Sequence, residues 1–95
     1  MPTFALICID KPDSLALRMA TREAHLAYMG QVADSLKYGG PLLDEAGNMN
    51  GSLIILEATD LAAARAVNAA DPYQLAGLFE RVEVRSLRPV LGQKA

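Results

Sequence analysis

The sequence predicts one α+β domain, spanning residues 1–95, in which two helices cover one face of a four-stranded antiparallel sheet. Its length of 95 residues allows one hydrophobic core and is too short for two. Short apolar runs typical of strands alternate with longer segments of helical periodicity. Glycine, proline and aspartate separate these segments, which follow one another as strand, helix, strand, strand, helix, strand.

The first strand is expected over residues 3–10 and ends at the breaker Asp10-Lys11-Pro12. Its apolar side chains alternate onto both faces of the sheet, so we expect both faces to be covered. Cys8, the only cysteine, lies within this run, and we interpret it as a small core residue. A lone cysteine excludes an intrachain disulfide and a thiolate metal site.

Two helix-start signals follow the first strand. Asp13 and Ser14 can cap a first helical turn, and Thr21 can cap a longer helix. From Thr21 onward, apolar residues recur at spacings of three and four, which predicts one buried stripe. Its members are Leu26, Met29, Ala33 and Leu36. Gly39-Gly40 then supplies the glycine expected after a helix end.

The second half of the chain is expected to form the remaining three strands and the second helix. A weak strand is expected over residues 41–43, a hairpin loop over 44–51 and the strongest strand over 52–58. Thr59 and Asp60 can cap an alanine-rich helix over residues 61–70. Asp71-Pro72 stops that helix, because a residue before proline avoids the helical conformation. A short helical turn over residues 73–79 and a half-exposed strand over 82–87 complete the domain.

This order of elements is the ferredoxin-like β-α-β-β-α-β pattern. Right-handed crossovers place both helices on one face of the sheet and leave the other face uncovered. The first and third strands are nevertheless apolar on both faces, and apolar residues make up 52% of the chain. We therefore expect the uncovered face to pack against the same face of a second copy, as a sheet-on-sheet homodimer.

Composition excludes several classes of function. The net charge is −2 with both signs scattered, so neither nucleic acid nor an anionic membrane is an expected partner. The chain has one histidine and no ligand-like spacing of carboxylates, so no metal is expected. No phosphate-binding glycine loop is present, and no other cofactor is expected. With no signal-like or membrane-spanning run, we expect a cytoplasmic protein.

The predicted topology brings a few polar residues to one end of the sheet. His25, the only histidine, lies three residues after Arg22 and so on the same side of its helix. In the predicted fold the start of this helix, Ser52 and the end of the second helix at Asp71 all lie at one end. Asp34, nine residues after His25, would face the opposite way about 13 Å along the helix, so we reject it as the partner.

These residues suit proton-transfer chemistry on a small molecule. Imidazole can take or give a proton near neutral pH, and an aspartate bonded to one ring nitrogen fixes its tautomer. Arg22 can bind a carboxylate or phenolate, or form a structural ion pair. Ser52 can hydrogen-bond an oxyanion or only satisfy a strand end, and Tyr73 is expected as an aromatic wall. Catalysis, ligand binding without catalysis and a purely structural role stay open.

Several short motifs together resemble the YciI-like (YCII-related) family. They are Arg22-x-x-His25-Leu26, Gly40-Pro41, Gly51-Ser52 and Asp71-Pro72-Tyr73 followed by Gly77. The first strand and the segment from Asp10 to Leu15 are also similar, so the resemblance covers nearly the whole chain.

The resemblance implies a ferredoxin-like dimer, related to the dimeric α+β barrels, with a pocket centred on a histidine–aspartate pair. On this sequence the pair is His25 with Asp71, and Arg22 and Ser52 match positions that line the pocket. The activities suggested for the family are lyase- or isomerase-like and include dehydrochlorination of aromatic compounds. A cofactor-independent lyase or isomerase acting on a small aromatic or carboxylated molecule is thus expected, with a non-catalytic binding or regulatory dimer as the alternative.

Overall fold

The computed structural model describes residues 1–92, and the last three residues of the expected 1–95 domain lie outside this range. Its elements, in chain order, are β1 (Thr3–Asp10), α1 (Leu15–Gln31), the 3₁₀ helix η1 (Ala33–Ser35), β2 (Leu36–Leu43), β3 (Met49–Glu57), α2 (Leu61–Ala69), α3 (Pro72–Leu75) and β4 (Phe79–Leu87). The strands form one antiparallel sheet in the order β2-β3-β1-β4. The expected α+β ferredoxin-like fold is confirmed.

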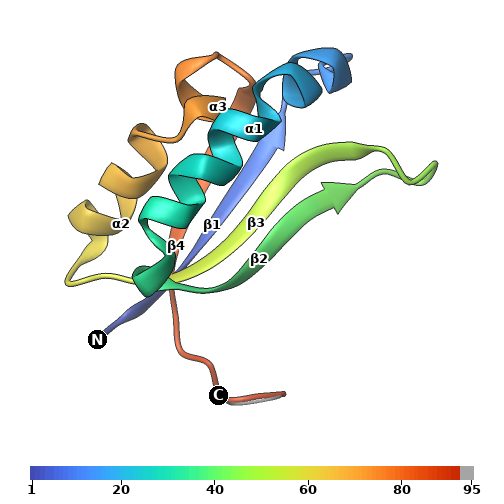
Figure 1. Ribbon diagram of the computed structural model, residues 1–95. Coiled ribbons are helices and arrows are strands. Elements are labelled where there is room, and N and C mark those ends of the chain that lie inside the picture. The colour runs from blue at the N-terminus through green and yellow to red at the C-terminus, as the bar shows by residue number, and fades with distance from the viewer. Residues whose placement is uncertain (93–95) are drawn as a thin grey trace.

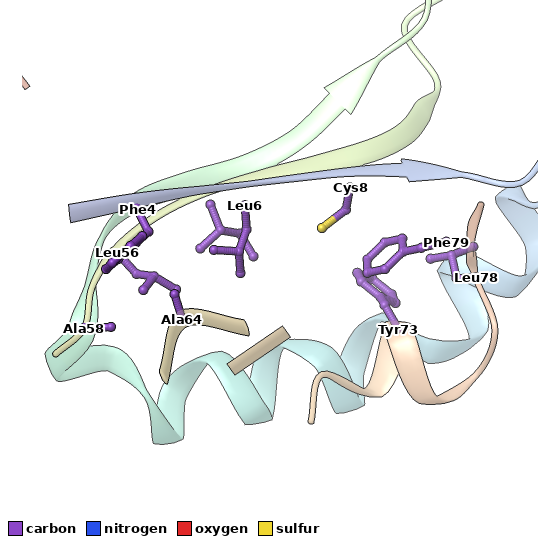
Figure 2. Packing of buried hydrophobic residues seen from close by; sticks show 10 residues of the cluster. Phe4, Leu6, Cys8, Leu56, Ala58, Ala64, Tyr73, Leu78 and Phe79 are labelled. Atoms are coloured by element: carbon purple, nitrogen blue, oxygen red, sulfur yellow. The ribbon is translucent and has the colours of Figure 1, made fainter. Parts of the chain in front are cut away.

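The helices lie on one face of the sheet (Figure 1). The buried hydrophobic cluster lies between the helices and the strands (Figure 2). Figure 2 shows Leu6 and Cys8 pointing from β1 toward the helices, with Tyr73 and Phe79 at one end of the core. Cys8 is buried, as expected for a small core residue. Because alternate residues of β1 point the opposite way, Ala5, Ile7 and Ile9 lie on the face without helices.

The first helix differs from its prediction in extent and in its buried face. It runs unbroken from Leu15 to Gln31, and Thr21 is inside it rather than at its cap, donating a hydrogen bond to the Leu17 carbonyl at 2.9 Å. The only buried residue of α1 is Arg18, while Leu26 of the predicted apolar stripe is 48% exposed. The stripe prediction was therefore wrong for Leu26 and Ala33, which are exposed, whereas Met29 packs against the core as expected. The inward side of this helix is polar at its start, where Arg18 is buried.

The second strand begins earlier than predicted. Leu36 and Gly39-Gly40 belong to β2, not to the helix or its end. A Cβ atom at Gly39 would lie 2.7 Å from the Leu53 carbonyl oxygen of β3, so glycine here permits close approach of the two strands. The hairpin loop is correspondingly shorter than residues 44–51, since β3 already starts at Met49.

The second half of the chain follows its prediction closely, with shifted bounds. Asp60 caps α2 by accepting a hydrogen bond from the Ala63 amide at 2.8 Å, and the helix ends at Ala69. The helical turn expected over residues 73–79 is α3, which starts at Pro72 and ends at Leu75. Strand β4 starts at Phe79, three residues before the predicted start, where its ring joins the core.

No helix within residues 1–92 is both long enough and apolar enough to cross a lipid bilayer.

Candidate functional site

His25 and Asp71 are in direct contact. The His25 Nδ1 atom of α1 lies 2.9 Å from the Asp71 Oδ1 atom, and both side chains are largely buried. Asp71 is also the N-cap of α3, where the same Oδ1 atom accepts a hydrogen bond from the Tyr73 amide at 2.9 Å. The cap holds the carboxylate in place, so the imidazole meets a fixed acceptor. The rejected partner Asp34 lies in η1, away from this contact.

Tyr73 forms the aromatic wall beside this pair. Its ring is 1% exposed and stacks on the His25 ring, with centroids 4.0 Å apart and planes inclined by 16°. The Arg18 Cζ atom lies 4.5 Å from the centroid of the same ring. Burial raises the pKa of the Tyr73 phenol, and the nearby charges of Arg18 and Arg22 offset only part of that rise.

Arg18 and Asp10 form a buried ion pair that the sequence analysis did not identify. The Nε and Nη2 atoms of Arg18 donate to the two carboxylate oxygens of Asp10 at 2.7 and 3.0 Å. Nη2 also donates to the Ser52 hydroxyl oxygen on β3 at 2.8 Å. Burial alone would lower the pKa of Arg18, but the hydrogen bonds and charge of Asp10 outweigh burial and raise this pKa above its usual value. The guanidinium is therefore a fixed cation.

A pocket of about 220 Å³ opens between α1 and the strands β2 and β3. Its polar wall is formed by side chains that the sequence analysis singled out, together with Arg18. They are Arg18, Arg22, His25, Ser52 and Tyr73. The remaining lining is mostly apolar or glycine, including Leu26, Met29, Ile54 and Gly39-Gly40. A polar wall facing apolar ones is typical of a small-molecule site.

Two nitrogen atoms in this wall are open to a ligand. Within residues 1–92, every side-chain nitrogen or oxygen atom that is sealed from solvent has a hydrogen-bond partner. His25 Nε2 and Arg18 Nη1 have no such partner in that range, so neither atom is sealed. Because both residues line the pocket, these atoms offer a base and a cationic donor to its contents.

Arg22 lies at the pocket as well, but it is exposed and its guanidinium makes no hydrogen bond or ion pair within residues 1–92. The structural ion pair considered for it, with Asp71 or a neighbouring glutamate, is absent from that part of the chain. Ser52 is buried and accepts from Arg18, which leaves its hydroxyl hydrogen available. No cluster of metal-ligating side chains occurs among the described residues.

If His25 and Asp71 had a purely structural role, no cavity would be expected beside the imidazole ring of His25. The pocket lies against that ring, so this expectation is not met.

Comparisons with known proteins agree with the motif resemblance. The model of the YCII-related domain family matches residues 3–88. Protein YciI of Escherichia coli O6:H1 is 37% identical over 95 residues, covering 92% of this chain and 97% of that protein. An uncharacterised Haemophilus influenzae protein is 34% identical over 96 residues, with 92% and 97% coverage.

Among solved structures, the 5-chloro-2-hydroxyhydroquinone dehydrochlorinase TftG from Burkholderia phenoliruptrix, in complex with 2,5-dihydroxybenzoquinone, superposes with a TM-score of 0.84. It is 31% identical, and the match covers 90% of this chain and 93% of that one. A NIPSNAP family protein from Agrobacterium tumefaciens is 18% identical with a TM-score of 0.59, covering 94% and 92%, and shows the same fold only.

Proposed function

The chain belongs to the YCII-related domain family, and we propose that it is a cofactor-independent lyase or isomerase that moves a proton on a small aromatic molecule. The observation that carries this proposal is the 2.9 Å contact between His25 Nδ1 and Asp71, with His25 Nε2 open to a pocket. The similarity to TftG, which is a dehydrochlorinase with a quinone ligand, supports the reaction class. The pocket volume of about 220 Å³ suits a single substituted ring.

In the proposed reaction, His25 Nε2 is the general base. Asp71 holds the proton of the imidazole on Nδ1, which leaves the lone pair of Nε2 for the substrate. Nε2 takes a proton from an O–H or C–H bond of the substrate, and the electron pair of that bond forms a new π bond. In an elimination from an aromatic ring, the imidazolium first returns the proton to the ring carbon that bears the leaving group, which gives a non-aromatic keto form. Loss of a second hydroxyl proton then forms another carbonyl π bond, and the leaving group departs from that carbon with its electron pair as an anion. In an isomerisation, the imidazolium returns the proton to another atom.

Arg18 and Ser52 are proposed to stabilise the negative charge that develops on a substrate oxygen. Asp10 occupies two nitrogen atoms of the guanidinium, so Arg18 presents Nη1 in a fixed direction. The buried ion pair is already formed before the ligand binds, and little reorganisation is needed when charge develops. Tyr73, stacked on His25, is proposed as a wall that keeps the imidazole plane in position.

We also propose that the protein acts as a homodimer through the face of the sheet without helices. On this face Ile7 pairs with Leu53 on β3, and both side chains are only half-buried in one chain. Ile7 also pairs with Glu83 on β4. Ile7→Lys would place an ammonium group beside Glu83, so we expect the single chain to fold with this substitution. The same charge would interrupt the apolar face and should prevent two copies from packing through it.

Analytical ultracentrifugation tests this assembly. The mass measured for the unmodified protein is expected to be twice the chain mass of 10.2 kDa, and the mass measured for the Ile7→Lys variant is expected to equal that of one chain. A monomeric unmodified protein would contradict the proposed dimer.

Release of chloride from 5-chloro-2-hydroxyhydroquinone, measured without oxygen, tests the activity. We expect the unmodified protein to release chloride, and His25→Gln to lower the rate by about 10²–10⁴-fold, the usual contribution of a general base. Asp71→Asn should also be slow, because an amide does not hold the same tautomer. Binding of 2,5-dihydroxybenzoquinone to His25→Gln, measured by calorimetry, controls for loss of the pocket.

Two results would count against the proposal. An unchanged rate in His25→Gln would remove His25 from the reaction. Binding of the quinone by the unmodified protein without turnover of any ring substrate would favour the non-catalytic binding protein instead.

A further inference from the structure

Arg22 is a cation of the pocket that the proposed reaction does not use. The proton transfer needs His25 and Asp71, and the developing charge is met by Arg18 and Ser52. Arg22 lines the same pocket, and its charge acts on the pKa of the Tyr73 phenol inside it. Within residues 1–92 no protein group neutralises its guanidinium.

Arg18, Arg22 and His25 all line the pocket from α1. Arg18 and Arg22 are four residues apart on one helix, which places them one turn, or about 6 Å, apart along its axis. His25 follows about 4.5 Å further on. The Arg18 guanidinium and the His25 ring both lie against the Tyr73 ring. Arg18 is buried and Arg22 is exposed, so the pocket has a deep cation and a cation at its mouth.

Among the described residues 1–92, no carboxylate side chain lines the pocket. Its ionisable side chains are two arginines, one histidine and two tyrosines. A ring that carries only neutral groups would leave the Arg22 guanidinium without a partner at the mouth. A carboxylate would match the planar fork of Arg22 and form charge-assisted hydrogen bonds with it.

The geometry points to Arg22 as a specificity residue that favours ligands with a carboxylate over neutral rings, so that the preferred substrate class is the hydroxylated aromatic acids. The ring hydroxyl lies toward Arg18 and His25, and the carboxylate lies toward Arg22. This inference rests on the proposed function for its site, but it is read out by binding and not by turnover.

A pair of ligands that differ in one group tests it. The probes are 2,5-dihydroxybenzoate and its neutral analogue 2,5-dihydroxybenzyl alcohol, with Kd measured by calorimetry. The variants are Arg22→Gln and, as the control, Arg65→Gln. Arg65 is exposed on α2, lies outside the pocket lining and loses the same charge when replaced.

The unmodified protein and Arg65→Gln are expected to bind the carboxylate at least about tenfold more tightly than the alcohol, the usual scale for a hydrogen-bonded charge pair. Arg22→Gln should lose that preference and bind the alcohol as before. The inference is overturned if Arg22→Gln keeps the preference, if Arg65→Gln loses it equally, or if the unmodified protein shows no preference or no binding of the carboxylate.

The outcomes separate this inference from the proposed function. A carboxylate preference that depends on Arg22, in a protein without turnover, refutes the proposed function and leaves Arg22 as the residue that selects the bound ligand. Turnover of a neutral ring at a rate that Arg22→Gln leaves unchanged, with no carboxylate preference in binding, supports the proposed function and refutes the inference about Arg22.

Discussion

Replacing Arg18 with methionine is predicted to lower the free energy of unfolding by about 3–5 kcal/mol, the usual cost of leaving one partner of a buried ion pair alone. The side chains of Arg18 and Asp10 are each only 3% exposed, so water cannot solvate the abandoned carboxylate. The variant also loses the hydrogen bond to Ser52 and the contact with the Tyr73 ring. Native proteins typically have a free energy of unfolding of about 5–15 kcal/mol, so the predicted loss is a large share of the total stability.

Urea denaturation followed by circular dichroism measures this loss, and a loss of about 3 kcal/mol should lower Tm by roughly 12–24 °C. The Asp10→Asn single variant and the double variant complete a thermodynamic cycle. We expect the double variant to lose less than the sum of the single losses, by about 0.5–3 kcal/mol, because it leaves no unpaired buried charge. A loss below about 1 kcal/mol in Arg18→Met, or strict additivity in the cycle, would refute the buried pair.

Three further predictions concern single positions. Burial, with a smaller contribution from the charge of Asp71, raises the pKa of Cys8 from 9.0 to about 12. At pH 8 its thiolate should therefore be ~1000-fold scarcer than that of an ordinary thiol, and iodoacetamide should label Cys8 only after denaturation; fast labelling of the folded protein would contradict this. Gly39→Ala should lower stability by about 1–3 kcal/mol in urea denaturation, because its Cβ would meet a backbone carbonyl at 2.7 Å, whereas Gly40→Ala, with nothing within 4 Å, should not; equal effects would refute the close approach. Asp60→Ala should lower the free energy of unfolding by about 1 kcal/mol in the same assay through loss of the α2 cap, and an unchanged free energy of unfolding would exclude that role.

The sequence was sufficient to bring His25 and Asp71 together, although they lie 46 residues apart. The order of elements and the handedness of crossovers place the start of α1 and the end of α2 at one end of the sheet. The apolar runs and the alternating pattern of the final strand are sufficient to assign the order of strands and helices from the sequence. The contact itself depends on α3, which was expected only as an unspecified helical turn.

Arg18 and Asp10 were missed for a local reason. Thr21 was interpreted as a cap, and this placed Arg18 outside the main helix and hid its spacing of four and seven residues from Arg22 and His25. In the folded chain the Thr21 hydroxyl bonds instead to the carbonyl four residues earlier, which helix interiors permit. Asp10 was interpreted as a strand breaker and as part of the family-like segment from Asp10 to Leu15, but not as a partner of Arg18. A single sequence does not show that a turn residue is buried beside a cation.

Gly39-Gly40 was misassigned because glycine suits two different environments. It is common after a helix end, but it also occurs in strands where another backbone comes close. Only the packing of β2 against β3 distinguishes these uses. The earlier start of β2 also explains why Leu36 packs from a strand and not from the helix.

The central claim is that His25 presents an unprotonated Nε2 to the ligand while Nδ1–H donates to Asp71. Long-range ¹H–¹⁵N NMR measures this directly, because the single histidine of the chain makes the assignment unambiguous. At a pH where the imidazole is neutral, we predict a protonated Nδ1 and an Nε2 whose ¹⁵N shift moves when 2,5-dihydroxybenzoquinone binds. A proton on Nε2 in the free protein, or an Nε2 shift that the bound ligand leaves unchanged, would contradict the claim.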